Sequence, residues 1–333
     1  MPLSTLIHRA SQPSPTLSEQ QARALLNQHY GFDGTLQALG SQQDLNFRLD
    51  SPQGRYVLKV CHGSYSAVEL EAQHAALGWL RERGVPVPAV RVSVSGEQLL
   101  ALDIDGQPIR ARLLDYIDGQ TLTRLKHMEP RLMAELGALC ARVDQALADF
   151  THPGLERTLQ WDPQHAQALI THLLPVLAES PRKVRVQTAA AQAQQALAPL
   201  LDQLPQQAVH LDITDDNAVW QRDAERQWQL QGVIDFGDLL RTWRIADLSV
   251  TCAALLHHAE GDPLRILPAV AAYHGLNPLT EAELRALWPL IVARAAVLVL
   301  SGEQQVSIDP DNHYSRANLA HEWEIFEVAD SVP

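Results

Sequence analysis

Two spacings of hydrophobic residues along the first sixty positions predict one helix followed by three strands. Leu17 to Tyr30 has helical periodicity. Three short apolar segments follow, with lengths typical of strands: Gly34–Leu39, Leu45–Leu49 and Tyr56–Val60. The Ser51-Pro-Gln-Gly54 segment favours a turn, so the last two strands are expected to form a hairpin.

The next stretch predicts a second helix and two more strands. Ser66–Gly84 repeats leucine and alanine at helical spacing, and Pro86 shortly afterwards favours the end of the helix. Strands are then expected at Val90–Val94 and Ile109–Leu114.

From Tyr116 onward the pattern becomes mainly helical. Helices are expected at Pro130–Phe150, Pro163–Ala178, Lys183–Leu204, Ile245–His258, Leu264–His274, Thr280–Leu300 and Ser315–Val328. Two strand-like runs, Ala218–Trp220 and Leu230–Ile234, interrupt them. The order predicts an α+β fold with two lobes, a small β-rich N-terminal lobe (1–115) and a larger, mainly helical C-terminal lobe (116–333), with a cleft between them.

Composition and charge narrow the classes of function. The chain has 333 residues, 46% of them hydrophobic, which is ordinary for a folded protein. A formal net charge of −13 would repel a phosphate backbone, and no Lys/Arg-rich run is present, so nucleic-acid binding is disfavoured. An acidic surface is compatible with cationic substrates.

The cysteines and the apolar segments indicate a protein of the cytoplasm. The three cysteines are scattered and form no CxxC pair, which fits neither a disulfide framework nor a zinc site. The N-terminal segment lacks the continuous apolar core of a secretory signal, so no export is expected. The most apolar stretch, Leu287–Leu300, contains Pro289 and Arg294 and is expected to be a buried helix, with no membrane span.

Two short segments carry groups suited to phosphoryl transfer. Val209–Asn217 contains His-x-Asp-x-x-x-x-Asn, and Gly232–Asp238 is an apolar strand that leads into Asp-Phe-Gly. The reaction needs an acceptor for the proton of the attacking hydroxyl, oxygen ligands for Mg²⁺, and a cation on the phosphates. Asp212 is the candidate for the first, and Asn217 and Asp235 are the candidate metal ligands. Each pattern alone is common in turns and helix caps, so the prediction rests on their ordered combination.

Lys59 is the candidate phosphate-binding cation, because it is a single charge in the apolar strand Tyr56–Val60. The alternation of strand side chains also allows a simpler interpretation, in which Lys59 points to solvent. Glu71 on the following helix is the expected partner of Lys59, and Glu69 is the competing one. Helical geometry separates the two glutamates by about 200°, so only one can face the lysine.

The nucleotide is expected to lie between a hairpin loop and the lobe junction. The loop Leu39–Phe47 has one glycine, and the Ser41 hydroxyl with backbone N–H groups of 40–43 is a candidate for binding the β-phosphate. A plain hairpin turn is an equally good interpretation of this segment. Adenine is expected beside Leu114, Tyr116 and Ile117. Together with the candidate metal ligands, these residues make ATP and Mg²⁺ the expected cofactors.

The order of these motifs resembles the aminoglycoside phosphotransferase and choline kinase-like superfamily over most of the chain. The resemblance is carried by Lys59, Glu71, Pro86-Val-Pro88, Leu113–Gly119, His210–Asn217 and Ile234–Asp238. Within the superfamily the chain is most similar to the hydroxylysine kinases, on Asp44–Phe47, Tyr56–Val60, Glu71–Gln73, Leu113–Gly119 and the catalytic loop. The resemblance implies a protein-kinase-like two-lobed fold. It also implies phosphorylation of a small hydroxylated amine or amino acid, with 5-hydroxylysine favoured as the acceptor.

The resemblance assigns roles to three further residues. His210 is expected to brace the catalytic loop, and Asp247 to anchor it. The family usually has glycine after this histidine, whereas the chain has Leu211, which is expected to alter the packing of the loop.

Three alternatives compete with this interpretation. Another small-molecule kinase of the superfamily would use homoserine, choline or ethanolamine, or an aminoglycoside as its acceptor. A nucleotide-binding module without turnover would fit the glycine-poor loop and Leu211. A protein kinase is disfavoured, because no Ala-Pro-Glu follows Asp235 and the His-x-Asp loop lacks its usual arginine.

Fewer sequence features indicate which side chains bind the acceptor than indicate the catalytic residues. Asp216, Asp238 and Glu322 are candidates for meeting an ammonium group, and Arg241 or Arg244 for meeting a carboxylate.

Overall fold

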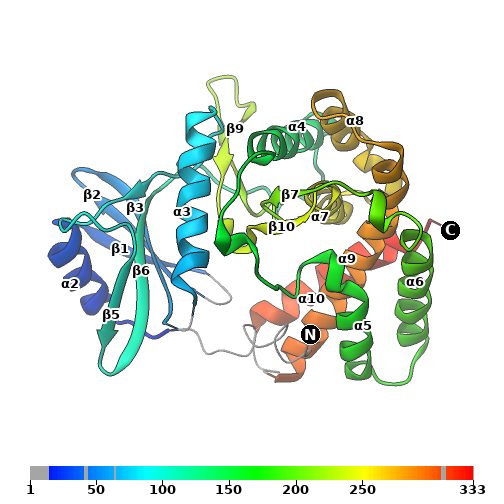
Figure 1. The fold of residues 1–333 in the computed structure, drawn as a ribbon, viewed down its shortest axis with the longest axis horizontal. Helices are drawn as coiled ribbons and strands as arrows, with labels where there is room; N and C mark the ends of the chain where they lie inside the picture. The colour runs from blue at the N-terminus through cyan, green and yellow to red at the C-terminus, as the bar shows by residue number, and fades with distance from the viewer. Residues whose placement is uncertain (1–14, 41–43, 64, 309–312, 333) are drawn as a thin grey trace.

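An antiparallel sheet with α2 and α3 forms one end of the molecule, and a group of helices forms the other (Figure 1). The computed structural model describes residues 15–40, 44–63, 65–308 and 313–332. The predicted α+β fold with a small β-rich lobe and a larger helical lobe is confirmed.

The sheet of the N-terminal lobe follows the strand order β1-β2-β3-β6-β4, and β5 pairs with β6. Its strands are β1 (Thr35–Leu39), β2 (Leu45–Ser51), β3 (Gly54–His62), β4 (Val90–Arg91), β5 (Leu100–Ile104) and β6 (Gln107–Asp115). The predicted β2–β3 hairpin is confirmed, with Ser51 opposite Gly54 at its turn. Strand β5 was not predicted.

The two faces of this sheet differ in character because side chains alternate along each strand. Tyr56, Leu58 and Val60 of β3 pack in a core with helix α2 (Glu19–Tyr30). Lys59 therefore points to the opposite face, where it is buried and only 8% exposed. It does not point to solvent.

Helix α3 (Ala67–Glu82) lies between the sheet and the helical lobe (Figure 1). Its residues Ala76, Leu77 and Leu80 belong to the large core of the helical lobe, although they precede position 115. The division of the chain into 1–115 and 116–333 stays a prediction.

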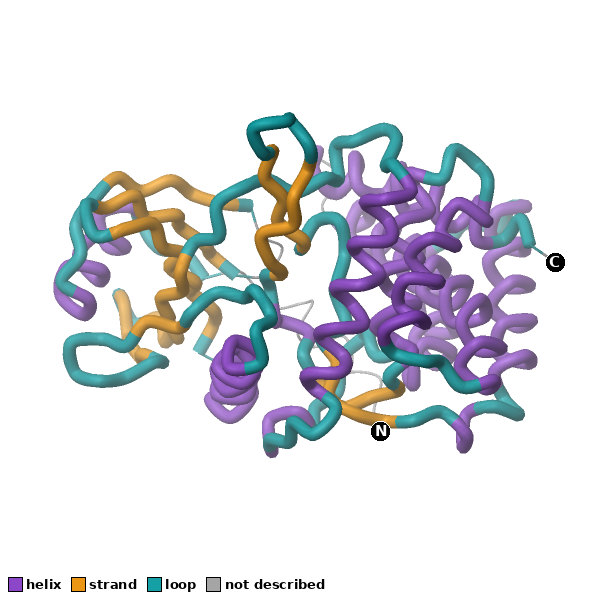
Figure 2. Tube along the Cα trace, turned by 90° about the horizontal axis from the view of Figure 1, so that it is seen from above, coloured by secondary structure: helices purple, strands orange, loops and turns teal. Residues whose placement is uncertain are grey.

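Helices make up most of the second lobe (Figure 2). They are α4 (Pro130–Leu147), α5 (Ala166–Leu173), α6 (Pro181–Leu197), α7 (Ile245–Leu255), α8 (Leu267–Leu276), α9 (Glu281–Ile308) and α10 (His313–Ala329). The single helix predicted at 163–178 is wrong, because short 3₁₀ turns replace its first and last turns. Pro175 lies in the second turn and cannot supply a helical N–H donor there.

Helix α9 is, within the described part of the chain, the single helix long and apolar enough to cross a membrane. Most of its apolar stretch is buried, and it packs against α5, α6, α7 and α10. The predicted buried helix is confirmed, and it continues through Pro289.

Two small antiparallel pairs of strands hold the loops that carry the predicted chemistry. One pair is β7 (Gln206–Val209) with β10 (Leu240–Trp243), and the other is β8 (Ala218–Arg222) with β9 (Trp228–Val233). Strands β7 and β10 were not predicted. The segment 210–217 connects β7 to β8, and 234–239 connects β9 to β10, so both loops emerge at the same place.

Candidate active site

Backbone and side-chain hydrogen bonds join the two loops. The N–H of Ile234 donates to the carbonyl oxygen of Asn217 at 2.9 Å. The N–H of Asp212 donates to Nδ1 of His210 at 3.1 Å, so the histidine proton lies on Nε2 and is donated to the Ile234 carbonyl at 3.1 Å. Burial lowers the pKa of His210, which keeps the ring neutral. The geometry agrees with the predicted bracing role.

Asp247 anchors the catalytic loop through its backbone N–H groups, as predicted. Its carboxylate accepts the backbone N–H groups of His210, at 2.9 Å, and of Leu211. Burial, followed by repulsion from Asp247, raises the pKa of Asp144 well above its usual range. Asp144 is therefore the protonated member of this buried pair, and Asp247 supplies the accepting oxygens.

Leu211 has an unusual backbone for a leucine. Its φ of 66° lies in the left-handed region, which costs a residue with a Cβ atom about 1–2 kcal/mol. The side chain is fully buried in a small core with Val209 and Leu240. Packing therefore stabilises a conformation that would otherwise favour glycine.

One carboxylate oxygen of Asp212 accepts a hydrogen bond, and the other faces the guanidinium group of Arg294. Nδ2 of Asn217 donates to Oδ2 at 2.6 Å, and Nη2 of Arg294 lies 3.9 Å from Oδ1, too far for a hydrogen bond. Burial and the nearby Asp238 raise the pKa of Asp212 to about 8, against the opposing effect of Arg294. The Asp212 side chain is 31% exposed, so Oδ1 lies where a small molecule can approach.

Asp235 lies across from the catalytic loop and binds the predicted lysine. Nζ of Lys59 is 3.1 Å from Oδ1 and 3.2 Å from Oδ2 of Asp235. Lys59 lowers the pKa of Asp235 to about 2, so the carboxylate is ionised at neutral pH. Nζ also lies 3.7 Å from Oδ2 of Asp44.

The predicted pairing of Lys59 with Glu71 is wrong in this structure. Glu71 lies on the exposed side of α3, whose inner side is formed by buried residues such as Leu70 and Gln73. Glu69 is on the other side of the helix and lies 3.8 Å from Arg157 of the helical lobe. The lysine is instead paired with Asp235 of the loop that follows β9.

The nucleotide-binding predictions have mixed outcomes. Ser41 lies outside the described residues. Leu114, near the end of β6, lies between Val57 of β3 and Val90 of β4. The N–H of Tyr116 donates to the Arg55 carbonyl at 3.0 Å. Ile117 lies against β9, where a side chain at Gly232 would meet its Cδ1 atom. The three predicted adenine-contact residues therefore lie at the junction of the lobes.

The donor set at the loops fits a hard divalent cation. Within the described residues the side chain of Asn217 makes two hydrogen bonds, both through Nδ2, so its oxygen is the atom turned away from Asp212. Asp235 supplies an ionised carboxylate. Amide and carboxylate oxygens are the ligands that Mg²⁺ and Ca²⁺ prefer.

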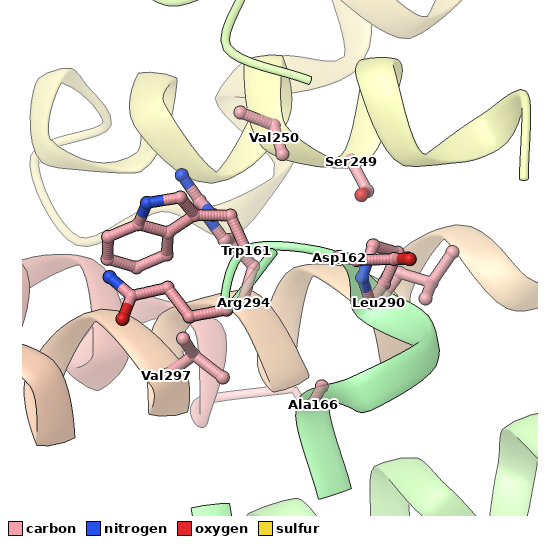
Figure 3. A pocket seen from close by; sticks show the side chains of 10 residues that line it. Trp161, Asp162, Ala166, Ser249, Val250, Leu290, Arg294 and Val297 are labelled. Carbon is pink, nitrogen blue, oxygen red and sulfur yellow. The ribbon is translucent and has the colours of Figure 1, made fainter. Parts of the chain in front are cut away.

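Three residues near the two loops, Arg112, Trp161 and Arg294, were not predicted from the sequence as part of the site. Arg294 on α9 places its guanidinium group 4.6 Å from the centre of the Trp161 ring (Figure 3). Arg112 faces Lys59 across β3 and β6 and is 6% exposed. The alternation within Ile109–Leu114 places Arg112 on the face opposite the apolar core, which was a usable indication. No spacing in the sequence links Arg294 or Trp161 to Asp212.

Two of the suggested acceptor contacts have other partners. Arg244 binds Glu283 through two hydrogen bonds, at 2.8 and 2.5 Å, so its role is structural. The hydroxyl of Thr123 donates to Asp216, which is exposed on the catalytic loop. Arg241 is exposed on β10.

Comparison with known proteins gives consistent matches over most of the chain. The model of a phosphotransferase enzyme family matches residues 35–287. Hydroxylysine kinase of Danio rerio is 25% identical over 335 residues, covering 95% of this chain and 94% of that protein. Homoserine kinase of Methylobacillus glycogenes is 28% identical over 256 residues, covering 76% of this chain and 73% of that protein.

Solved structures share the fold. Amicoumacin kinase hAmiN, in complex with AMP-PNP, Ca²⁺ and Ami, has a TM-score of 0.71 at 19% identity, and the match covers 95% of each chain. A microcompartment-associated aminopropanol kinase has a TM-score of 0.69 at 18% identity, covering 93% of this chain and 95% of the other.

Proposed function

The chain belongs to the phosphotransferase enzyme family and is a small-molecule kinase, and we propose that it transfers the γ-phosphoryl group of ATP to the hydroxyl of a small amine or amino acid. Hydroxylysine is the favoured acceptor. The observation that carries the proposal is the convergence of Lys59, Asp212, Asn217 and Asp235 at one end of the cleft.

Asp212 is proposed to accept the proton, or the hydrogen bond, of the attacking hydroxyl. Asn217 fixes the carboxylate through Oδ2, so Oδ1 is the atom presented to the acceptor. Burial raises the pKa of Asp212 to about 8, within about one unit of neutral pH, and a pKa near the working pH is suited to proton transfer. Positioning the hydroxyl is the larger part of catalysis in this reaction, because little covalent chemistry is asked of the protein.

The remaining roles concern the nucleotide. Asn217 and Asp235 would hold Mg²⁺, which neutralises charge on the β- and γ-phosphates when it is bound. Lys59 is proposed to bind the non-transferred phosphates from the sheet. Leu114, Tyr116 and Ile117 are proposed to contact adenine at the lobe junction, and Ser41 is proposed to contact the β-phosphate. Glu71 is exposed on α3, and Lys59 pairs with Asp235 and Asp44, so Glu71 is given no role in binding the nucleotide.

Hydroxylysine is favoured because relatives with that name match almost the whole chain. Homoserine kinases match a smaller share and supply the second candidate acceptor. Choline, ethanolamine and aminoglycosides complete the panel of acceptors to test.

The test is release of ADP from Mg-ATP with each acceptor in turn. We expect acceptor-dependent turnover with 5-hydroxy-L-lysine or another hydroxylated amine or amino acid. Absence of turnover with every acceptor would refute the proposal. Calorimetry with Mg-ATP checks the alternative of a non-catalytic nucleotide-binding module, which predicts binding without turnover.

A further inference from the structure

Arg294, which lies near Asp212, and Glu322 are two ionisable residues of the helical lobe, and each has a buried polar atom without a hydrogen bond. These atoms are Nη1 of Arg294 and Oε2 of Glu322. Within the described residues no ion pair joins the two side chains, yet burial raises the pKa of Glu322 to about 7 against the opposing effect of Arg294. The two charges therefore lie within electrostatic reach but do not satisfy each other. Buried polar atoms without partners are costly, which points to a ligand.

The position of Arg294 is fixed by its surroundings. Its stem packs on α9, its guanidinium group lies over the Trp161 ring, and the space left beside them is about 10 Å³ (Figure 3). That space is room for no more than one water molecule. On the side of Trp161 the guanidinium group therefore has no room to move away, and on its other side Nη2 lies 3.9 Å from Oδ1 of Asp212.

Glu322 is placed by a glycine on the neighbouring helix. A Cβ atom at Gly302 of α9 would overlap Oε2 of Glu322, so the carboxylate of Glu322 needs glycine at that position. The fold thus places the guanidinium group of Arg294 on α9 beside Oδ1 of Asp212, and the carboxyl group of Glu322 on the neighbouring helix α10.

We propose that Arg294 binds the α-carboxylate, and Glu322 the α-ammonium group, of a zwitterionic amino-acid acceptor, an inference that rests on the phosphoryl-transfer function proposed above. A planar guanidinium group binds a carboxylate with two parallel hydrogen bonds. Asp212 does not occupy Arg294, because 3.9 Å is too long for a hydrogen bond. An acceptor held this way has its hydroxyl on the side of Oδ1.

The proposal narrows the substrate class. Choline, ethanolamine and aminoglycosides have no carboxylate, so they would leave a buried cation unmatched, and sites with unmatched polar groups discriminate strongly. Among the candidate acceptors, hydroxylysine and homoserine carry the required pair of charges.

The test compares acceptors that differ in the carboxylate alone. The first pair is 5-hydroxy-L-lysine and 1,5-diaminopentan-2-ol, and the second is L-homoserine and 3-aminopropan-1-ol. Binding to the full-length protein is measured by calorimetry in the presence of Mg-ADP. We expect the acid to bind about 10- to 100-fold more tightly than its decarboxylated partner in at least one pair.

Four variants and a control separate the roles of Arg294 and Glu322. Arg294→Met is expected to remove the preference for the acid and leave affinity for the decarboxylated amine within about threefold, and Arg294→Lys is expected to restore part of the preference. Glu322→Gln is expected to weaken both members of a pair by similar factors, because both keep the ammonium group. Gly302→Ala, which displaces the Glu322 carboxylate without removing its charge, is expected to act in the same direction. Arg285→Met, at an exposed position of α9, is the control and is expected to change neither affinity.

The outcomes distinguish this inference from the function on which it rests. Equal binding of acid and amine, no binding of either acid, or loss of the preference in Arg285→Met and not in Arg294→Met would each overturn the inference. Preference for the acid without release of ADP from Mg-ATP would support the site and refute the phosphoryl-transfer function. Release of ADP without a preference for the acid would support the phosphoryl-transfer function and refute the binding site.

Discussion

Lys59 and Asp235 are 176 positions apart in the sequence, and Nζ of the lysine lies 3.1 Å from Oδ1 of the aspartate. The ion pair joins strand β3 of the sheet to the loop that follows β9 of the helical lobe. It brings the proposed phosphate-binding cation and a proposed metal ligand into contact, at the place where the phosphates of a nucleotide would lie.

Removal of the Lys59 ammonium group should weaken catalysis through the nucleotide. Lys59→Met is expected to lower kcat/KM for ATP by about 100-fold or more, because a fixed cation on the phosphates is lost. Steady-state kinetics with varied ATP measure the change. Lys183→Met on α6, which removes an ammonium group paired with Glu179, is the matched control and should leave kcat/KM unchanged. An equal loss in both variants would contradict the proposed role.

Asp212→Asn should impair the chemical step and spare nucleotide binding. The substitution keeps the size of the side chain but removes the proton acceptor, so kcat is expected to fall by about 10²- to 10⁴-fold. Calorimetry should show Mg-ATP affinity within a few-fold of the original protein. Asp216→Asn, four positions further along the same loop, is expected to lower kcat by less than about tenfold. If the two variants lose the same activity, Asp212 has no special part in the reaction.

The left-handed backbone of Leu211 predicts an unusual order of stabilities. Leu211→Ala should lower the free energy of unfolding by about 2–5 kcal/mol, because it leaves a cavity in a buried cluster. Leu211→Gly removes one more carbon but relieves a left-handed conformation at φ 66°, so it should be at least as stable as the alanine variant. Urea unfolding measures both.

Leu240 provides the matched comparison for this order. It lies in the same buried cluster but in strand β10, where the backbone favours residues other than glycine. Leu240→Gly should be less stable than Leu240→Ala by about 1 kcal/mol. The same order at both positions would show that backbone strain at Leu211 is not significant.

His74 should make the protein less stable in mild acid. Burial, followed by repulsion from Arg112, lowers the pKa of His74 to about 3, whereas an unfolded histidine has a pKa of 6.5. Below pH 6.5 the unfolded state therefore binds a proton that the folded state does not, so stability is full above pH 6.5 and falls down to about pH 3. Between pH 7 and pH 5 the loss from this residue is expected to be about 2 kcal/mol.

The measurement is the difference in urea stability between pH 7 and pH 5, with and without the imidazole. His74→Gln is expected to show a pH-dependent loss smaller by about 2 kcal/mol. His172 on α5 is exposed, and His172→Gln is the control in which the loss should be unchanged. An unchanged loss in His74→Gln would show that the ring is protonated in the folded protein.

The longer elements could be predicted from the sequence because their patterns are local. The β2–β3 hairpin depends on a turn between two apolar runs, and α3 and α10 have helical spacing over several turns. Strands β5, β7 and β10 were missed because each has only four or five residues. Such short strands are specified by their pairing partners more than by their own composition.

Part of the candidate site could likewise be predicted from local sequence patterns, and part could not. The order of Lys59, Asp212, Asn217 and Asp235 is a property of the sequence, and the structure joins them in two hydrogen-bonded pairs on neighbouring segments. The partner of Lys59 depends on how the lobes and α3 are packed, which a single strand and helix do not specify. Arg294 looked like an interruption in an apolar helix, because its distance of 3.9 Å from Asp212 exists only in the folded chain.

The most direct test of the central claim is the identity of the product. The full-length protein is incubated with Mg-ATP and 5-hydroxy-L-lysine, with L-homoserine in parallel, and the products are followed by ³¹P NMR. The account predicts a new phosphate monoester on the side-chain oxygen of at least one acceptor, formed in a 1:1 ratio with ADP and nearly absent with Asp212→Asn. No phosphate monoester with either amino acid, or undiminished formation with Asp212→Asn, would contradict it.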